Sequence, residues 1–524
     1  MDTRTRMTRS RFRFGIATAL TAAVLFTSTA CAGGAEQEEA GTAPNGASSN
    51  TTLALAVTAA PASLDPAQLQ EGQQTYVWGS VFDTLLYVDN DGKLQPNAAE
   101  SWKFSDDGLT LTLTLREGMT FSNGDPVTAK DVAGTLDRTR TTPGQQQSKL
   151  AAVASIEAPD DRTVVLKLKQ PEPALLTNLA LAAGVIGDAD TLNEKTTALD
   201  PTTSGPYTLD KAATVAGTTY VLNRRDDYWN AKAYPFKTVT VRVIQDRTAV
   251  FNALQAGELD AGNVEPAQVK QIEAAGFKTA KVEAQAVANL VLADREGTIL
   301  KPLADERVRK AINMAFDREK MVQQVLRGGG KATMQIFNPK GAAYDPALEG
   351  TYKFDPTAAK KLMADAGYAD GFDVTMPATV ISKSFEPLIT QALNDIGIRV
   401  TWEPVPPQNA AAAVSSKKYP MIFFLDGLNV TQRELQNNFS DSGFLNPFGS
   451  KYPELTELIS KVSLETDEAK AAELYKEINA FVVKEALDAP LFYVGTIWAT
   501  KDGIEYLGDG SNTMSTIRAF NATK

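Results

Sequence analysis

The residue types that this 524-residue chain lacks narrow its chemistry first. Histidine is absent, which excludes the Ser-His-Asp and Cys-His nucleophile systems and every imidazole-based zinc site. The 63 acidic residues leave open a pair of carboxylates of the kind that glycoside hydrolases use. No sequence pattern singles out such a pair. The sequence therefore predicts no metal site, no cofactor and no catalytic residue.

The single cysteine, Cys31, lies in a sequence that indicates covalent modification. It follows Ser28-Thr29-Ala30 and precedes Ala32, which resembles the bacterial lipobox, where a small residue precedes a cysteine that receives diacylglycerol. Leucine is usual at the position of Ser28. There is no second cysteine for an intramolecular disulfide, so the unpaired thiol of an exported protein requires another explanation. We expect lipidation at Cys31; the alternative is a cleavable signal with an incidental cysteine.

The segments before and after Cys31 are arranged as in an export signal that is followed by a tether. Five arginines between Arg4 and Arg13 precede an uncharged, largely apolar stretch from Gly15 to Ala30, as in a secretory signal. A retained anchor helix is the alternative, but it needs about 20 strongly apolar residues. The residues that follow Cys31 have too few apolar side chains to offset the entropy of ordering them. We predict a signal peptide over 1–30 and a flexible tether over 31–50.

The net charge limits the partners of the chain. The formal charge is −11, of which residues 1–30 contribute +4, so the remainder carries about −15. A charge of this size and sign argues against nucleic acid or anionic lipid as the principal ligand.

Strand and helix patterns alternate along the roughly 475 residues after the tether, more than one hydrophobic core usually supports. We therefore expect at least two lobes of mixed α/β structure. Strand candidates are 53–58, 109–115, 164–168, 239–244, 290–292 and 398–402, of which 109–115 has a clear period of two. Helix candidates are 305–327, 355–366, 467–487 and a helix opened by the capping-box residues Thr128 and Asp131.

A series of short motifs also runs through most of the chain. It comprises 61–66 (PASLDP), 81–86 (VFDTLL), 94–102 (LQPNAAESW), 115–132 (LREGMTFSNGDPVTAKDV), 204–207 (SGPY), 227–229 (DYW), 255–260 (QAGELD), 305–312 (DERVRKAI), 365–368 (DAGY) and 396–398 (IGI). In this order and spacing, the series resembles family 5 of the extracellular solute-binding proteins, which serve oligopeptide, dipeptide and nickel ABC importers. Most of these motifs are structural, since Gly-Asp-Pro and Gly-Pro-Tyr supply turn geometry.

The resemblance implies a type II periplasmic-binding-protein-like α/β fold with an extra subdomain. Two lobes are joined by two crossing segments and close on the ligand by hinge motion. By this resemblance, lobe I combines 51–85, 205–290 and 490–524. Residues 86–204 form a subdomain inserted into lobe I, and lobe II spans 291–489.

The resemblance also indicates where ligand recognition takes place. In peptide-binding members, an aspartate in a Trp-x-x-Asp stretch pairs with the terminal ammonium of the peptide. Here Asn429 falls nearest that position and Asp426 stands three residues earlier, in a segment that also contains Phe424. We take Phe424, Asp426 and Asn429 as candidate ligand contacts. A carboxylate in a loop or cap is the alternative for Asp426.

Aromatic side chains are further candidates, since they line many small-ligand clefts. Tyr76 and Trp78 precede the 81–86 motif, and Tyr493 and Trp498 lie in the return to lobe I. Core packing is the alternative for all four.

The function implied is that of a substrate-binding lipoprotein, not an enzyme, on the extracytoplasmic face of a cell membrane. It would be a monomer that captures a solute for an ABC permease and its ATPase subunits. Short peptides, opine-like amino-acid conjugates, modified sugars and chelated metals all fit. Direct nickel coordination does not, because nickel prefers imidazole. Two alternatives stay open: a secreted carboxylate-dependent hydrolase, and a lipoprotein that presents its ligand to a sensor.

Overall fold

A computed structural model describes residues 51–523, apart from four single positions at 328, 442, 466 and 515. The predicted signal peptide, Cys31 and the tether lie outside the described residues. Within the described part, no helix is long and apolar enough to cross a membrane.

The first lobe is built on part of a nine-stranded sheet. Its strands are β1 (Thr52–Val57), β8 (Tyr207–Leu209), β9 (Thr219–Arg224), β10 (Thr238–Val243) and β11 (Ala261–Asn263). β1 is parallel to β10 and β11, and β9 and β8 continue the sheet in antiparallel order. Apolar side chains of α1 (Thr75–Val81) pack on one face, and those of α4 (Arg247–Gln255) and α5 (Val269–Ala274) pack on the other.

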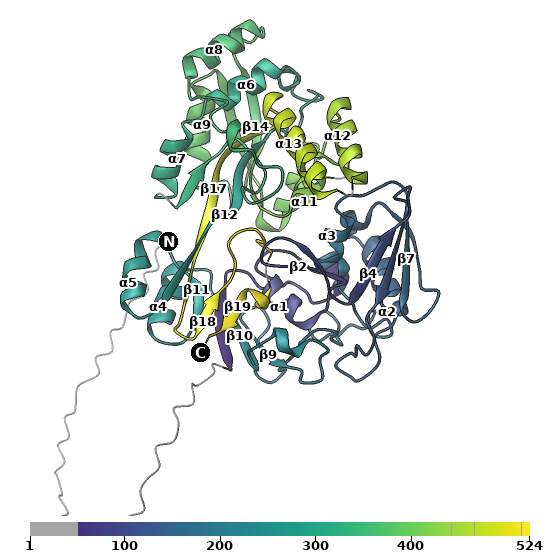
Figure 1. Cartoon of the computed structure of the whole chain (residues 1–524). Helices are drawn as coiled ribbons and strands as arrows, with labels where there is room; N and C mark the ends of the chain where they lie inside the picture. The colour runs from purple at the N-terminus through teal and green to yellow at the C-terminus, as the bar shows by residue number, and fades with distance from the viewer. Residues whose placement is uncertain (1–50, 328, 442, 466, 515, 524) are drawn as a thin grey trace, which may run out of the picture. The chain divides into compact units, whose positions relative to one another are not determined.

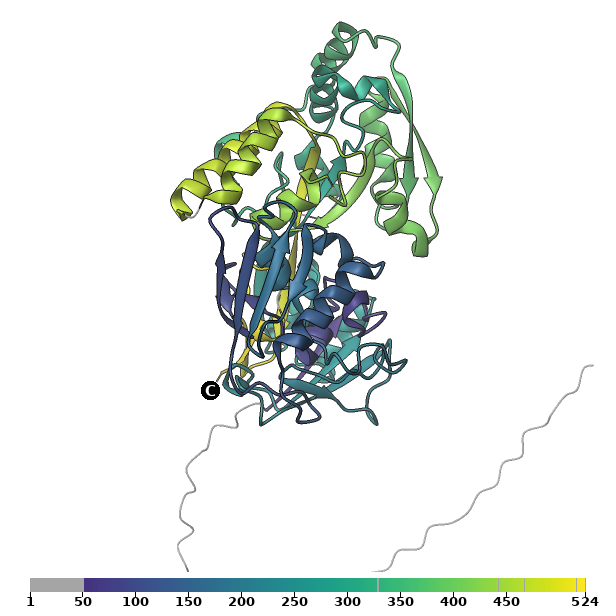
Figure 2. The same cartoon turned by 90° about the vertical axis from the view of Figure 1, so that its right-hand side faces the viewer.

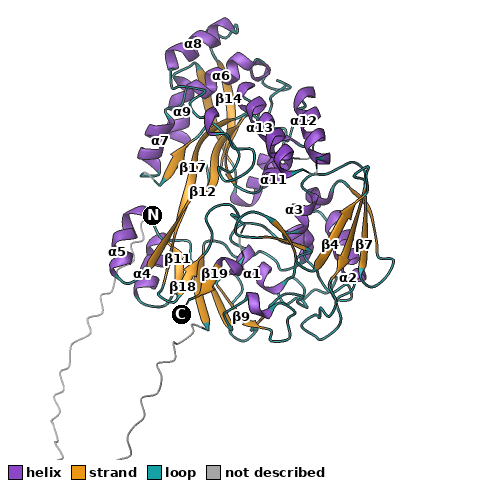
Figure 3. Cartoon of the chain, in the orientation of Figure 1, coloured by secondary structure: helices purple, strands orange, loops and turns teal. Residues whose placement is uncertain are grey.

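The inserted subdomain has its own sheet and core. The sheet order is β4 (Ala99–Phe104), β5 (Thr110–Leu115), β7 (Thr163–Leu168) and β6 (Val153–Glu157), all antiparallel. The period of two in β5 buries its leucines and leaves its threonines half-buried. Helix α2 (Ala129–Thr141) contacts this sheet (Figure 3) and begins with the predicted Thr128–Asp131 capping box. The hairpin β2 (Leu86–Val88) and β3 (Leu94–Pro96) and the short α3 (Leu175–Leu179) complete the subdomain.

The second lobe packs around several hydrophobic clusters, of which the two largest lie beneath its sheet strands and between its C-terminal helices. Its strands are β13 (Gly330–Ala332), β14 (Phe372–Ala378), β15 (Ile398–Pro404) and β16 (Ile422–Gly427). Its helices are α6 (Glu306–Met314), α7 (Arg318–Val325), α8 (Pro356–Asp365), α9 (Glu386–Asn394), α10 (Ala410–Val414), α11 (Thr431–Phe439), α12 (Pro453–Leu464) and α13 (Glu468–Lys484). Figure 2 shows α12 and α13 as the adjacent yellow-green pair.

One predicted helix is wrong in its extent, because residues 305–327 form two helices, α6 and α7. The chain breaks at Asp317, whose carboxylate accepts a hydrogen bond from the backbone N–H of Lys320 and starts a new helix. Arg318 fixes the junction by donating to the carbonyls of Asn313 and Pro490, at 2.8 Å each. The helix predicted from Asp355 forms as expected: the Asp355 carboxylate caps α8 at the backbone N–H of Ala358.

Two long antiparallel strands, β12 (Lys278–Val291) and β17 (Ala489–Thr500), run through both lobes (Figure 1). β17 pairs with β11 in the first lobe, whereas the last six residues of β12 pair with β16 in the second. Between Val282 and Ala286 the ladder is irregular. Gly495 lies there, and a Cβ on it would come within 2.6 Å of the Val282 carbonyl oxygen. We expect this irregularity to serve as the hinge. After β17, the hairpin β18 (Ile504–Tyr506) and β19 (Phe520–Ala522) packs into the first-lobe core.

Candidate functional site

A cleft of about 1130 Å³ opens between the two lobes. One side is lined by Gln70, Glu71, Gly72 and Gln74 of the first lobe and by Gly144, Gln145, Gln146, Ser148 and Lys149 of the subdomain. The other side is lined by β16, α10, α11 and the loops next to them, and Met514 from the C-terminal segment also contributes. Small-molecule sites typically enclose about 300–1000 Å³, so this interlobe cleft is large enough for a solute of several residues.

The three second-lobe candidates, Phe424, Asp426 and Asn429, all line the interlobe cleft. Strand periodicity explains two of them, because side chains alternate between the two faces of β16. Phe423 packs into the core beneath the sheet, while Phe424 and Asp426 lie on the opposite face.

Asp426 is a half-buried carboxylate that no described cation neutralises by direct ion pairing. It accepts hydrogen bonds from Nδ2 of Asn437, at 3.2 and 3.3 Å, and a longer one of 3.5 Å from Nδ2 of Asn438. Burial raises the pKa of Asp426 to about 6, although these amides and the charges of Lys149 and Arg433 oppose the shift. The group is thus mainly ionised at neutral pH, and it suits a cationic group on a solute.

Asn429 contributes mainly through the backbone of its loop. Its backbone N–H donates to Glu434 Oε1 at 3.0 Å, and its own Oδ1 accepts from the backbone N–H of Val430 at 2.9 Å. Glu434 also accepts from the backbone N–H of Asn338. Burial raises the pKa of Glu434 to about 8, despite these two backbone donors, and the charge of Asp426 adds to the shift.

The four aromatic candidates lie in the core and do not line the interlobe cleft. Tyr76 and Trp498 meet edge to face at 5.9 Å in the first-lobe core. Tyr493 and Trp498 belong to β17, a strand that is flanked by β11 and β12 and buried on both faces. The Tyr493 hydroxyl donates to the Phe337 carbonyl at 2.7 Å. This placement favours the core-packing alternative. Trp78 contacts the cleft wall from behind, since its Nε1 donates to the carbonyl of Gln70, a residue that lines the cleft.

Sequence reasoning missed an ion pair that joins the two sides of the cleft. Arg433 of α11 pairs with Glu71 of the first lobe at 2.5 Å, and the two side chains are only 7% and 13% exposed. The same guanidinium donates to Oδ1 of Asn178 in α3 at 2.6 Å. Arg433 and Glu71 are 362 residues apart in the chain, so no local pattern could have identified the pair.

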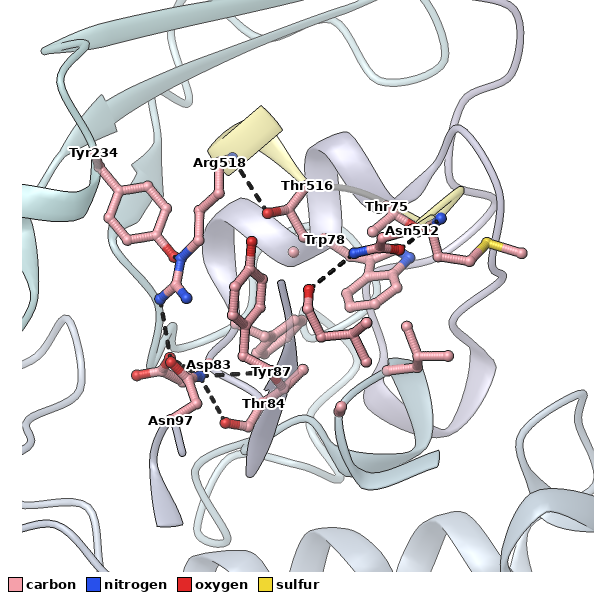
Figure 4. A pocket seen from close by; sticks show the side chains of 16 residues that line it. Thr75, Trp78, Asp83, Thr84, Tyr87, Asn97, Tyr234, Asn512, Thr516 and Arg518 are labelled. Atoms are coloured by element: carbon pink, nitrogen blue, oxygen red, sulfur yellow. Dashed lines mark hydrogen bonds between the residues drawn. The ribbon is translucent and has the colours of Figure 1, made fainter. Parts of the chain in front are cut away.

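A second, much smaller cavity of about 30 Å³ lies in the first lobe beside Asp83 and Arg518 (Figure 4). Its volume accommodates about one water molecule, so it is not a solute site. Asp83 accepts from the Tyr228 hydroxyl and from Nε1 of Trp229 at 2.8 Å each, and from Nδ2 of Asn97 at 3.0 Å. Its backbone N–H donates to Oγ of Ser204. Four of the sequence motifs therefore meet at Asp83, an arrangement that favours a structural role for them.

Within the described residues, no three or more cysteine or acidic side chains are grouped so that they could hold a metal ion.

Comparisons with known proteins identify the architecture. Residues 93–452 match the model of a family described as bacterial extracellular solute-binding proteins, family 5 middle. The glutathione-binding protein GsiB of Salmonella typhi is 25% identical over 449 residues, which cover 82% of this chain and 86% of that protein.

Among the solved structures that share the fold are those of two binding proteins with bound solutes. The periplasmic binding protein DppA of Helicobacter pylori, in complex with the peptide STSA, superposes with a TM-score of 0.78 at 23% identity, over 91% of this chain and 99% of that one. The binding protein AgaA of Agrobacterium tumefaciens R10, in complex with agropinic acid, gives 0.76 at 24% identity, over 90% and 99%. The fold is that of the two-lobed periplasmic binding proteins, as predicted.

Proposed function

Since the chain belongs to family 5 of the bacterial extracellular solute-binding proteins, we propose that it captures a peptide-like or other small solute in the interlobe cleft. It then delivers the solute to the permease and ATPase subunits of an ABC importer. The family consists of binding proteins, and we include in the proposal that this chain acts as a monomer without catalytic turnover. Neither the hydrolase nor the sensor alternative has support in the relatives described above.

The observation that carries the proposal is the Asp426 carboxylate in the interlobe cleft. A half-buried carboxylate without a counter-ion among the described residues gains from a cationic partner, because a charge-assisted hydrogen bond is about twice as strong as a neutral one. Asp426 thus supports recognition of an amine-bearing solute. The relatives named above bind glutathione, the peptide STSA and agropinic acid. We place the solute's cationic group at Asp426, with Phe424 and Asn429 beside it.

Membrane attachment is part of the proposal. The protein would be exported by residues 1–30 and anchored through a diacylglycerol on Cys31, with residues 31–50 as its tether. The tether would keep the lobes close to the permease and free to reorient. Intact-mass spectrometry of the mature protein tests this, because lipidation adds a diacylglycerol mass that a Cys31→Ser variant lacks. A mature wild-type protein without that mass would contradict the anchor.

The binding function is tested by native mass spectrometry of protein purified from its own cells, since a closed cleft can retain its solute. We expect one amine-bearing solute per chain. Affinity for that solute is then measured for Asp426→Asn and for Asp441→Asn, the latter being a matched control. Asp441 lines the same cleft, but it is 69% exposed and already paired with Lys451 at 2.7 Å. If both Asp426 and Asn429 are changed to alanine and the affinity does not change, these residues do not form the solute site.

A further inference from the structure

Lys149 is a charged residue on the subdomain side of the interlobe cleft. It lies in the short turn Gln147–Leu150 that follows α2. Its backbone carbonyl accepts from Nδ2 of Asn178 at 3.0 Å, and Asn178 is in turn held by Arg433 of the second lobe. The backbone at Lys149 is therefore fixed on the cleft by contacts that reach both lobes.

The Lys149 ammonium has no partner of its own among the residues that the structure describes: it forms no ion pair and donates no hydrogen bond to them. It is half-buried, and burial lowers its pKa to about 8, with the charge of Arg433 adding to the shift. An ammonium has three donors and no acceptor, and a partly desolvated charge is costly when it stays unpaired.

The carboxylates that act electrostatically on Lys149 are Glu71, Asp426 and Glu172. Glu71 already forms an ion pair with Arg433 at 2.5 Å. Glu172 caps a turn by accepting from the backbone N–H of Ala174 at 3.1 Å. Asp426 accepts from the amides of α11. Since Arg433 and Glu71 neutralise each other, Lys149 and Asp426 are left as two opposite, unpaired charges that line one cleft from different sides.

We infer that Lys149 binds a carboxylate of the solute while Asp426 binds its cationic group, so that the preferred solutes are zwitterions. This inference rests on the proposed function and narrows its substrate class. It favours short peptides and amino-acid conjugates, which carry both charges, over neutral sugars and over amines without an acid group. Because Lys149 comes from the subdomain and Asp426 from the second lobe, a zwitterion that contacts both would favour the closed arrangement.

The test uses a deproteinised extract of the producing cells as the probe. Wild-type protein is stripped of bound solute by unfolding and refolding, mixed with the extract, and examined by native mass spectrometry. One portion of the extract is first methyl-esterified to block carboxylates, and another is acetylated to block amines. We expect wild-type protein to retain a solute from the untreated extract, and at least tenfold less of it from either treated extract.

The variants Lys149→Gln and Lys130→Gln are compared in the same assay. Lys130 is an exposed lysine of α2 in the same subdomain and does not line the cleft, so it is the matched control. We expect Lys149→Gln to lose at least tenfold in occupancy and Lys130→Gln to match wild type. If Lys149→Gln fails to refold, the esterified extract on wild-type protein still decides the question.

The outcomes separate the inference from the proposed function. Retention that survives esterification would overturn the zwitterion inference and leave solute binding intact. Full retention of the solute by Lys149→Gln would overturn the role of Lys149 in binding the solute's carboxylate, and it would also leave solute binding intact. Retention of nothing from the untreated extract would count against the proposed function itself.

Discussion

Replacement of Asp426 by asparagine should stabilise the ligand-free protein at neutral pH while it weakens solute binding. Burial raises the pKa of Asp426 to about 6, whereas an aspartate in an unfolded chain has a pKa of about 3.9. The folded state therefore holds this proton more strongly than the unfolded state does. Below about pH 4 both states are protonated and the group has no effect. As the pH rises from about 4 to 6, the free energy of unfolding falls. Above pH 6 the ionised Asp426 destabilises the folded state by its full amount.

The magnitude follows from the size of the shift. A difference of about two pKa units corresponds to roughly 3 kcal/mol of lost stability, at about 1.4 kcal/mol per unit. The Asp426 side chain lies on a water-accessible cleft and is only half-buried by surface area, so solvent screening should remove about half of this cost. Asparagine keeps one acceptor oxygen for Asn437 and its new amide can reach cleft water. We therefore expect a gain of about 1–2 kcal/mol at pH 7.5.

Urea unfolding of ligand-free wild type, Asp426→Asn and Asp441→Asn at pH 4 and pH 7.5 measures this effect. The stability advantage of Asp426→Asn over wild type should grow by about 1–2 kcal/mol from pH 4 to pH 7.5. The exposed Asp441 should give no such growth. An advantage that stays constant with pH, or an Asp426→Asn variant that is less stable at pH 7.5, would refute the reasoning.

Three further variants test the framework of the cleft. Glu71→Gln removes the partner of Arg433 and should shift the ligand-free protein toward an open form, seen as a larger radius of gyration by small-angle X-ray scattering; an unchanged radius would contradict this. Gly495→Ala places a Cβ 2.6 Å from a carbonyl oxygen and should cost at least about 2 kcal/mol in urea unfolding, whereas the control Gly134→Ala in α2 should be neutral or stabilising. Asp83→Ala removes the shared acceptor of Tyr228, Trp229 and Asn97, of which Asn97 Nδ2 also donates to the Thr84 carbonyl. It should lower stability by about 3 kcal/mol, and a much smaller loss in the same assay would show that the network can rearrange.

Elements whose pattern is local could be predicted from the sequence, and those that depend on distant contacts could not. The alternation from Leu109 to Leu115 gives β5, and Asp355-Pro356 gives the start of α8. The helix predicted over 305–327 failed because the apolar spacing continues across a break set by Asp317 and by the contacts of Arg318 with β17.

The same distinction holds for the cleft. The position of Phe424, Asp426 and Asn429 at the cleft could be predicted because they share one short segment whose place in the family is known. Lys149 and Glu71 were not found, since their role depends on which residues of the other lobe they face. The four aromatic residues are near the right segments, but their side chains are buried in the core: Tyr493 and Trp498 on the central strand β17, and Tyr76 and Trp78 on α1, which packs against the first-lobe sheet.

The charge state of Glu434 explains how a cleft with several acids can suit a zwitterion. The charge of Asp426 acts on Glu434, and two ionised carboxylates lining one cleft would attract a doubly charged cation. Burial holds the pKa of Glu434 at about 8, so this group is mainly neutral at pH 7 and stabilises its loop through backbone N–H groups. Asp426 then carries one negative charge, Lys149 one positive charge, and the pair of Arg433 and Glu71 none. A solute with one charge of each sign matches this balance, whereas a dication or a dianion would leave one charge uncompensated.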